Sequence, residues 1–144
     1  SFLILIESVL KEKQIDLIRM DIEGHEVSIF KSLIEYIQKY KAKPSILFEP
    51  HISKYNKENN MFDQLKKLFA MGYSLQVAAS SSKEANQKFN SKNYKSIKSF
   101  NTDEKIRDIY LNISNTDALD FLSIEGGVRT ALLSCKTEYK KFIQ

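Results

Sequence analysis

The strongest constraint on the fold is a pair of short apolar runs that enclose one amphipathic segment. Residues 15–22 (IDLIRMDI) stop at Glu23-Gly24, and residues 45–49 (SILFE) begin just after Pro44. Between the two runs, apolar residues recur at helical spacing with Lys, Glu and Gln interleaved. Two runs of strand length around one such helix predict a right-handed βαβ unit with two parallel strands.

The same alternation of apolar runs and helical patterns continues downstream and predicts a single α/β domain over residues 1–144. Only four Gly and two Pro interrupt the sequence, which argues against an all-β protein rich in tight turns. We expect a mostly parallel sheet with flanking helices. The expected elements are a helix over 2–10, a helix over 62–69, a strand over 73–79, a polar surface loop or lid over 80–101, a helix over 102–113, a strand over 118–124 and a closing helix over 128–142.

Composition and charge exclude several classes of protein. No apolar run approaches the ~20 residues that cross a bilayer, so we expect no membrane span and a soluble, cytoplasmic protein. The single cysteine, Cys135, rules out a disulfide framework. The formal net charge is +4, and the segment 80–102 alone carries that excess, with five lysines against one glutamate. Because nucleic-acid-binding proteins usually spread basic residues over a whole face, we expect no nucleic-acid partner.

Titratable side chains follow both strands of the predicted βαβ unit. Asp21 and Glu23 lie at the end of the first strand, with Glu26 at the start of the helix, and Glu49 and His51 lie at the end of the second strand. Ligands of open parallel sheets collect beyond the carboxyl ends of the strands. If the two strands are parallel neighbours, these side chains lie close together at the edge of the sheet where both strands end. A group of carboxylates with a histidine there would suit proton abstraction or metal binding.

Each of these residues also has a purely structural explanation. Asp21 and Glu23 could cap the helix that begins near Gly24, and Glu26 could interact with the helix dipole. His51 alone would more often be a loop histidine with satisfied hydrogen bonds, and His25 is expected at the surface. The hypothesis of a functional site rests on their convergence, and hence on the two strands being parallel neighbours.

The segment IDLIRMDIEGHEVSIFKSL resembles the signature of the FkbM family of S-adenosylmethionine-dependent methyltransferases. Arg19, His25 and Ser32 depart from the family pattern, where Lys, a small residue and Gly are usual. SILFEPH resembles the family's next acidic strand end and contains Glu49 and His51. The resemblance covers about residues 1–80, and the matching positions are Asp16, Asp21, Glu23, Gly24, Glu26 and Lys31.

The resemblance implies a Rossmann-like class I methyltransferase fold with S-adenosylmethionine as methyl donor. In that family the methyl donor binds a glycine-rich loop that follows the first strand of the complete domain. The present sequence has no glycine before Gly24, so it contains no such loop upstream of the strand over 15–22. We therefore expect the 144 residues to be the C-terminal part of a longer enzyme, without the donor-binding half of the domain. The strand over 15–22 would then be an exposed edge, and we expect the chain either to pair this edge with a second copy, giving a homodimer, or to rearrange around it.

The leading functional hypothesis is methyl transfer to an oxygen of a small metabolite or glycan. Glu49 or His51 would be the catalytic base, Asp21, Glu23 and Glu26 would bind substrate, and Asp21 would also contact the donor. This hypothesis assigns no metal ligand. One alternative is a metal-dependent phosphodiesterase or nuclease, since neighbouring carboxylates can hold Mg²⁺. Another alternative is a non-catalytic module that dimerises or binds a partner.

Overall fold

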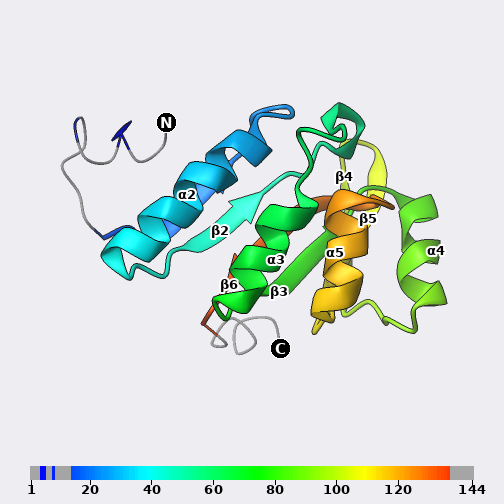
Figure 1. Cartoon of the computed structure of the whole chain (residues 1–144). Coiled ribbons are helices and arrows are strands. Elements are labelled where there is room, and N and C mark those ends of the chain that lie inside the picture. Colours follow the sequence, from blue (N-terminus) through cyan, green and yellow to red (C-terminus); the bar gives the residue numbers. More distant parts are fainter. Residues whose placement is uncertain (1–3, 6–7, 9–13, 137–144) are drawn as a thin grey trace.

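The computed structural model describes residues 4–5, 8 and 14–136, which form a six-stranded sheet with four α-helices (Figure 1). The predicted helix over residues 2–10 falls mostly outside the described residues. No helix within the described ranges combines the length and the apolar character that crossing a membrane requires.

The predicted βαβ unit is confirmed. Strand β1 (Leu17–Met20) and strand β2 (Ser45–Phe48) are parallel neighbours, and helix α2 (Glu26–Tyr40) connects them. The inward positions of α2 are apolar at helical spacing, so one face of the helix is buried. Phe30 of α2 packs edge-on against Phe48 of β2, with ring centroids 5.0 Å apart. This contact fixes the helix over the sheet.

The next two predicted elements are also confirmed. Helix α3 (Phe62–Ala70) buries Leu65 and Leu68, and strand β3 (Ser74–Ser80) follows it. Helices α2 and α3 contact each other, and α3 also contacts helix α5 (Asn115–Ser123). Figure 1 shows the helices gathered over one face of the sheet.

From residue 80 onward, the predicted secondary structure is wrong. The expected polar loop over 80–101 contains helix α4 (Lys83–Ser91) and strand β4 (Lys98–Thr102), and the helix expected over 102–113 is strand β5 (Lys105–Leu111). The strand expected over 118–124 is part of helix α5 (Asn115–Ser123). The closing helix expected over 128–142 is strand β6 (Val128–Ser134) in its described part. Residues 137–144 lie outside the described residues.

The expectation of a mostly parallel sheet is also wrong. The strand order is β1-β2-β6-β3-β5-β4, and of the pairings among described residues only β1 with β2 is parallel. Strand β6 runs antiparallel to both of its neighbours, β2 and β3. Strands β1, β2 and β3 therefore still point in the same direction, and their carboxyl ends lie at the same edge of the sheet.

Aromatic stacking joins α4 and α5 to the sheet. The ring of Phe89 in α4 lies 4.0 Å from the ring of Tyr110 in β5 and 4.3 Å from the ring of Phe121 in α5, centroid to centroid. All three side chains are almost completely buried. The segment from residue 83 to 91 is thus part of the core and not a solvated loop.

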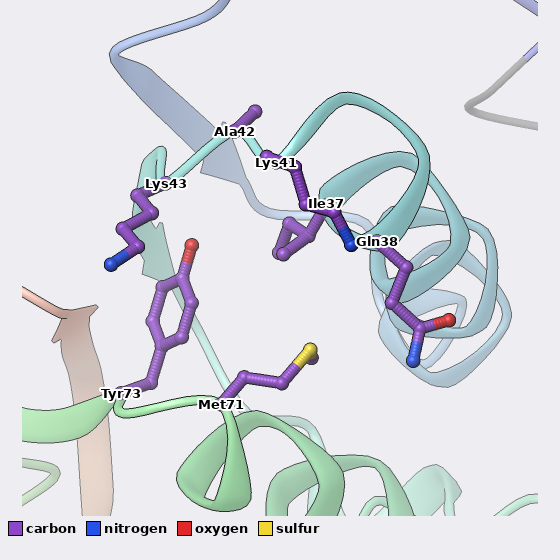
Figure 2. A pocket seen from close by; sticks show the side chains of 7 residues that line it. All are labelled: Ile37, Gln38, Lys41, Ala42, Lys43, Met71 and Tyr73. Carbon is purple, nitrogen blue, oxygen red and sulfur yellow. The ribbon is translucent and has the colours of Figure 1, made fainter.

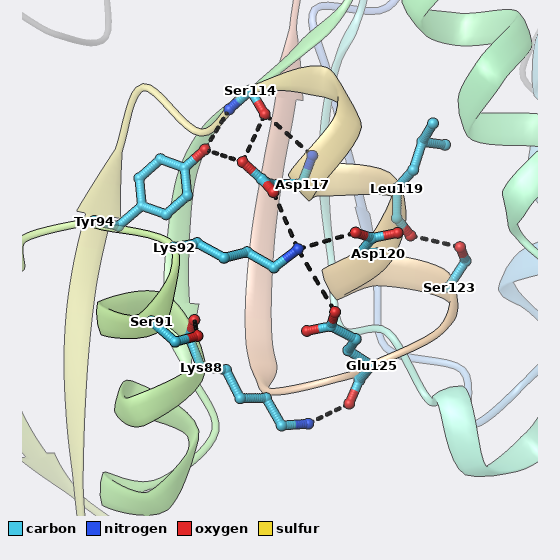
Figure 3. A network of polar contacts seen from close by, with 10 residues as sticks. All are labelled: Lys88, Ser91, Lys92, Tyr94, Ser114, Asp117, Leu119, Asp120, Ser123 and Glu125. Carbon is cyan, nitrogen blue, oxygen red and sulfur yellow. Dashed lines mark hydrogen bonds and ion pairs between the residues drawn. The ribbon is translucent and has the colours of Figure 1, made fainter.

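Lys92, one of the lysines expected in a solvated loop, is instead held by acidic side chains of the α5 region (Figure 3). Its Nζ lies 3.0 Å from Asp117 and 2.9 Å from Asp120, and both hydrogen bonds raise the pKa of Lys92. The Tyr94 hydroxyl donates to Asp117 at 2.6 Å, which is the main reason that the pKa of Asp117 is lowered. These contacts tie the end of α4 to α5, so the basic segment offers less free charge than its sequence suggests.

Candidate functional site

The carboxyl ends of β1 and β2 bring the first candidate residues together. Met20 pairs with Phe48 at the end of the parallel ladder, and Asp21 and Glu49 are the next residues of the two strands. The Glu49 amide still donates to the Met20 carbonyl at 3.2 Å, which keeps the two backbones side by side past the last paired residues. The prediction that the two strands are parallel neighbours, on which the site hypothesis depends, is confirmed.

Asp21, Glu49 and His51 form a compact cluster that we call the rim triad. One side-chain oxygen or nitrogen atom of each residue lies within 4.8 Å of the corresponding atoms of the other two. The Nε2 atom of His51 is 3.9 Å from an Asp21 oxygen, which is too long for a hydrogen bond. Solvent reaches the triad, because the Asp21 side chain is 40% exposed and that of His51 is 22% exposed.

Glu26 is not one of the three rim-triad residues, but its side chain contacts His51. Its Oε1 atom lies 2.7 Å from Nδ1 of His51 and accepts a hydrogen bond from the Gly24 amide at 3.1 Å. The residue is 0% exposed, so Glu26 lies behind His51 and not on the open surface of the cluster. An ionised carboxylate only accepts hydrogen bonds, so opposite an ionised Glu26 the proton of a neutral His51 would lie on Nδ1. The lone pair of Nε2 is then directed away from Glu26.

Tyr55 is a further neighbour of Glu26 that the sequence analysis did not single out. Burial and the charge of Glu26 raise the pKa of the Tyr55 hydroxyl, so it stays protonated beside the carboxylate. A lone tyrosine after a short 3-10 helix (Ile52–Lys54) carries no sequence signal for such a position. Its proximity to Glu26 depends on the fold alone.

Glu23 is not part of the rim triad, although the sequence placed it beside Asp21. The pattern assumed an extended chain, in which residues two apart point to the same side. Glu23 instead has a φ of +50° and Gly24 a φ of +101°, so the chain turns at these two residues. Glu23 and His25 are both exposed, and the surface position expected for His25 is confirmed.

Gly24→Ala is expected to destabilise the protein by about 2–3 kcal/mol, from backbone strain and overpacking together. An added Cβ would lie 2.5 Å from Cβ of Lys54, in a backbone conformation that L side chains rarely adopt. Chemical denaturation should show the loss. Gly72→Ala is the matched control, since Gly72 has a φ of +91° with no atom within 4 Å of the new Cβ. Equal losses in both variants would contradict the close approach at Gly24.

Arg129 is the basic partner that the sequence analysis missed. It lies near the start of β6, and its Nη1 atom forms an ion pair with Oε2 of Glu49. Sequence reasoning gave no sign of this pair, because β6 follows β2 in sequence by about eighty residues and yet lies directly beside it. Residue Arg129 could only have been found by predicting this antiparallel pairing.

A hollow of about 290 Å³ opens next to Glu49, on the side of Arg129. Its wall includes the exposed ring of Phe100 and the hydroxyls of Thr102 and Thr130. Arg107 also lines it, and hydrogen bonds to Thr102 and to the Ser81 carbonyl hold the guanidinium in place. The hollow therefore combines one aromatic surface with fixed polar groups.

A second hollow, of about 350 Å³, is lined by residues outside the rim triad, and Figure 2 shows these lining side chains. Lys41, Ala42 and Lys43 precede β2, and Met71 and Tyr73 precede β3, so these residues mark the edge at which the strands begin. The Tyr73 hydroxyl donates to the Pro44 carbonyl at 2.9 Å. This hollow has no candidate site residue in its wall.

The comparisons with known proteins identify the family. The family model described as the methyltransferase FkbM domain matches residues 4–75, which is half of the chain and includes Asp21, Glu26, Glu49 and His51. No curated protein and no solved structure matches the chain. The matched residues contain the segment that carries the resemblance noted in the sequence, so the chain belongs to the FkbM methyltransferase family.

Proposed function

We propose that this chain contributes the acceptor side of a site that transfers a methyl group from S-adenosylmethionine to a hydroxyl oxygen. The observation that carries the proposal is the rim triad at the ends of β1 and β2, inside the region that matches the family. The acceptor would be a small metabolite or a glycan. The hollow beside Glu49 is a suitable place for its body, because one ring and several fixed polar groups can orient a molecule with hydroxyls.

His51 is the better of the two expected bases. Its Nδ1 atom is engaged by Glu26, so its Nε2 lone pair is directed toward the exposed side of the triad. Glu49 is already paired with Arg129, and an oxygen in an ion pair is less available to take a proton. Glu26 would act as a positioning residue that fixes the tautomer and orientation of His51.

The chemistry is an in-line displacement. S-adenosylmethionine supplies an electrophilic methyl group on a sulfonium centre. The acceptor oxygen forms a bond to the methyl carbon, the carbon–sulfur bond breaks with its electron pair going to sulfur, and the hydroxyl proton goes to Nε2 of His51. Such a reaction needs positioning and a base more than covalent help from the protein.

Asp21 and Glu23 would supply negative charge to the same edge. The partly exposed carboxylate of Asp21 could accept a hydrogen bond from the acceptor hydroxyl or from the ammonium group of the donor. Glu23 is exposed on the adjacent turn and could meet the donor there. As part of the proposal, the remaining donor contacts come from a Rossmann-like half of the domain outside these residues.

The experiment is transfer of a labelled methyl group from S-adenosylmethionine by the full-length protein, with a panel of hydroxylated metabolites and glycans as acceptors. We expect label in one acceptor as a methyl ether, with one S-adenosylhomocysteine formed per ether. Label on nitrogen or sulfur of the acceptor, or no transfer to any hydroxylated compound, would overturn the proposal.

A further inference from the structure

We propose that the rim triad of Asp21, Glu49 and His51 also binds a divalent transition-metal cation. The three residues come from two neighbouring strand ends, and each offers one donor atom within 4.8 Å of the other two. Two carboxylate oxygens and one imidazole nitrogen form a donor set used for such cations. Three protein ligands also leave coordination positions open for water or for an acceptor oxygen.

Glu26 provides an independent reason to expect a cation. A histidine that binds a metal almost always donates its other ring N–H to a carboxylate or a carbonyl. Glu26 takes this place, with its Oε1 atom 2.7 Å from Nδ1 of His51. The residue is 0% exposed, its second oxygen is buried without a hydrogen bond, and the neutral Tyr55 hydroxyl beside the carboxylate brings no positive charge. Burying an ionised carboxylate in this way destabilises the folded protein unless a positive charge lies nearby. A cation bound to His51 would supply that positive charge.

The charges around the triad favour a cation as well. Asp21, Glu26 and Glu49 are acidic, and Arg129 is the basic side chain paired with Glu49. Arg129 contacts Oε2, so the other oxygen of Glu49 is the one left for a metal. A doubly charged cation would balance the remaining negative charge.

The donor set also selects among cations. Mg²⁺ and Ca²⁺ prefer sites made only of oxygen atoms, whereas imidazole favours transition metals. Mn²⁺ accepts both kinds of donor and is readily followed by electron paramagnetic resonance. It is therefore the probe that we choose, and Mg²⁺ is the comparison.

A bound cation has a consequence that rests on the proposed function. One Nε2 lone pair cannot hold a cation and accept a proton at the same time. If His51 is the base, methyl transfer must fall as the cation occupies the triad.

The test is a titration of the metal-free full-length protein with Mn²⁺. Calorimetry measures the affinity and the stoichiometry, and electron paramagnetic resonance detects the ligands of the bound ion. We expect one Mn²⁺ per chain, with hyperfine coupling to an imidazole nitrogen, and at least tenfold weaker binding of Mg²⁺. Asp21→Asn, Glu49→Gln and His51→Gln should each weaken Mn²⁺ binding at least tenfold, and His51→Gln should abolish the nitrogen coupling. Glu35→Gln, which removes an exposed charge on α2 outside the triad, should leave the binding unchanged.

Circular dichroism of each variant establishes that it is folded, and Glu49→Asp, which keeps the charge, replaces Glu49→Gln if that variant unfolds. Absence of saturable Mn²⁺ binding, equal binding in the triad variants, or equal affinity for Mg²⁺ would overturn the inference. The proposed function is assayed separately without metal, so its failure would leave the Mn²⁺ result standing. A rise of methyl transfer with Mn²⁺ occupancy would support the metal site and overturn the role of His51 as proton acceptor.

Discussion

His51→Gln should lower kcat for methyl transfer by about 10²–10⁴-fold, the usual contribution of a positioned general base. The expected loss follows from the geometry around the imidazole ring. Glu26 holds Nδ1 at 2.7 Å, and the side chain is 22% exposed, so the free nitrogen can reach a bound acceptor. Glutamine keeps a polar side chain of similar reach but has no basic nitrogen. The KM for the acceptor should change much less than kcat, because the proton moves only in the reaction step.

His25→Gln is the matched control for this experiment. His25 lies two residues after Glu23 on the same loop, is exposed, and is not part of the rim triad. Its replacement should leave kcat and KM unchanged. Glu26→Gln should give an intermediate kcat, because an amide oxygen still accepts a hydrogen bond from Nδ1 but carries no charge to stabilise a protonated imidazole. Wild-type kcat in the His51 variant would remove His51 from the mechanism.

Phe89→Ala should destabilise the protein by about 3–5 kcal/mol, as expected for removing a buried phenylalanine from a packed core. The ring is 0% exposed and stacks on both Tyr110 and Phe121. Its loss would leave a cavity between α4, α5 and β5 and remove two aromatic contacts. Urea denaturation, monitored by circular dichroism, should show unfolding at a lower midpoint concentration of urea.

Phe100→Ala serves as the control for the Phe89 variant. Phe100 is 43% exposed on strand β4, so its removal should change the free energy of unfolding by less than about 1 kcal/mol. Similar losses in the two variants would mean that residue 89 is not a core position. The comparison therefore also tests whether the segment around α4 is folded, where the sequence had indicated a loop.

Within the described residues, the part of the chain that matches the family is also the part whose helices and strands the sequence predicts correctly. The apolar runs at 15–22 and 45–49 are bounded by Gly24 and Pro44, and the helix between them shows clear helical periodicity. These are strong local signals, because the turn residues and the apolar pattern agree. Helix α3 has the same agreement between its apolar face and Gly72 at its end.

The second half lacks these signals at its turns. The β4–β5 hairpin turns at Asp103 and Glu104, which have φ values of +52° and +60°. Such turns usually contain Asn or Gly, so nothing in the sequence marked a hairpin. The run ALDFLSI is too short for periodicity to separate strand from helix. The missed signal was Ser114, whose hydroxyl accepts a hydrogen bond from the Asp117 amide and caps α5.

The candidate site was predicted where it depends on β1 and β2, and missed where it depends on other elements. Asp21, Glu49 and His51 follow from two parallel strand ends. The burial of Glu26 depends on the loop that carries His51 and Tyr55 folding back over the start of α2. The pairing of Arg129 with Glu49 depends on β6 lying beside β2. Neither relation leaves a pattern in the sequence near these residues.

The position of β6 has a consequence for how the protein forms during synthesis. The last described strand lies in the middle of the sheet, between β2 and β3. Strand β6 is the strand that pairs with both β2 and β3. Until residues 128–134 have left the ribosome, no strand therefore connects the β1-β2 pair to the β3-β5-β4 group. Any sheet that forms before that point is therefore incomplete and has an open inner edge, and unpaired edges of this kind are prone to aggregation.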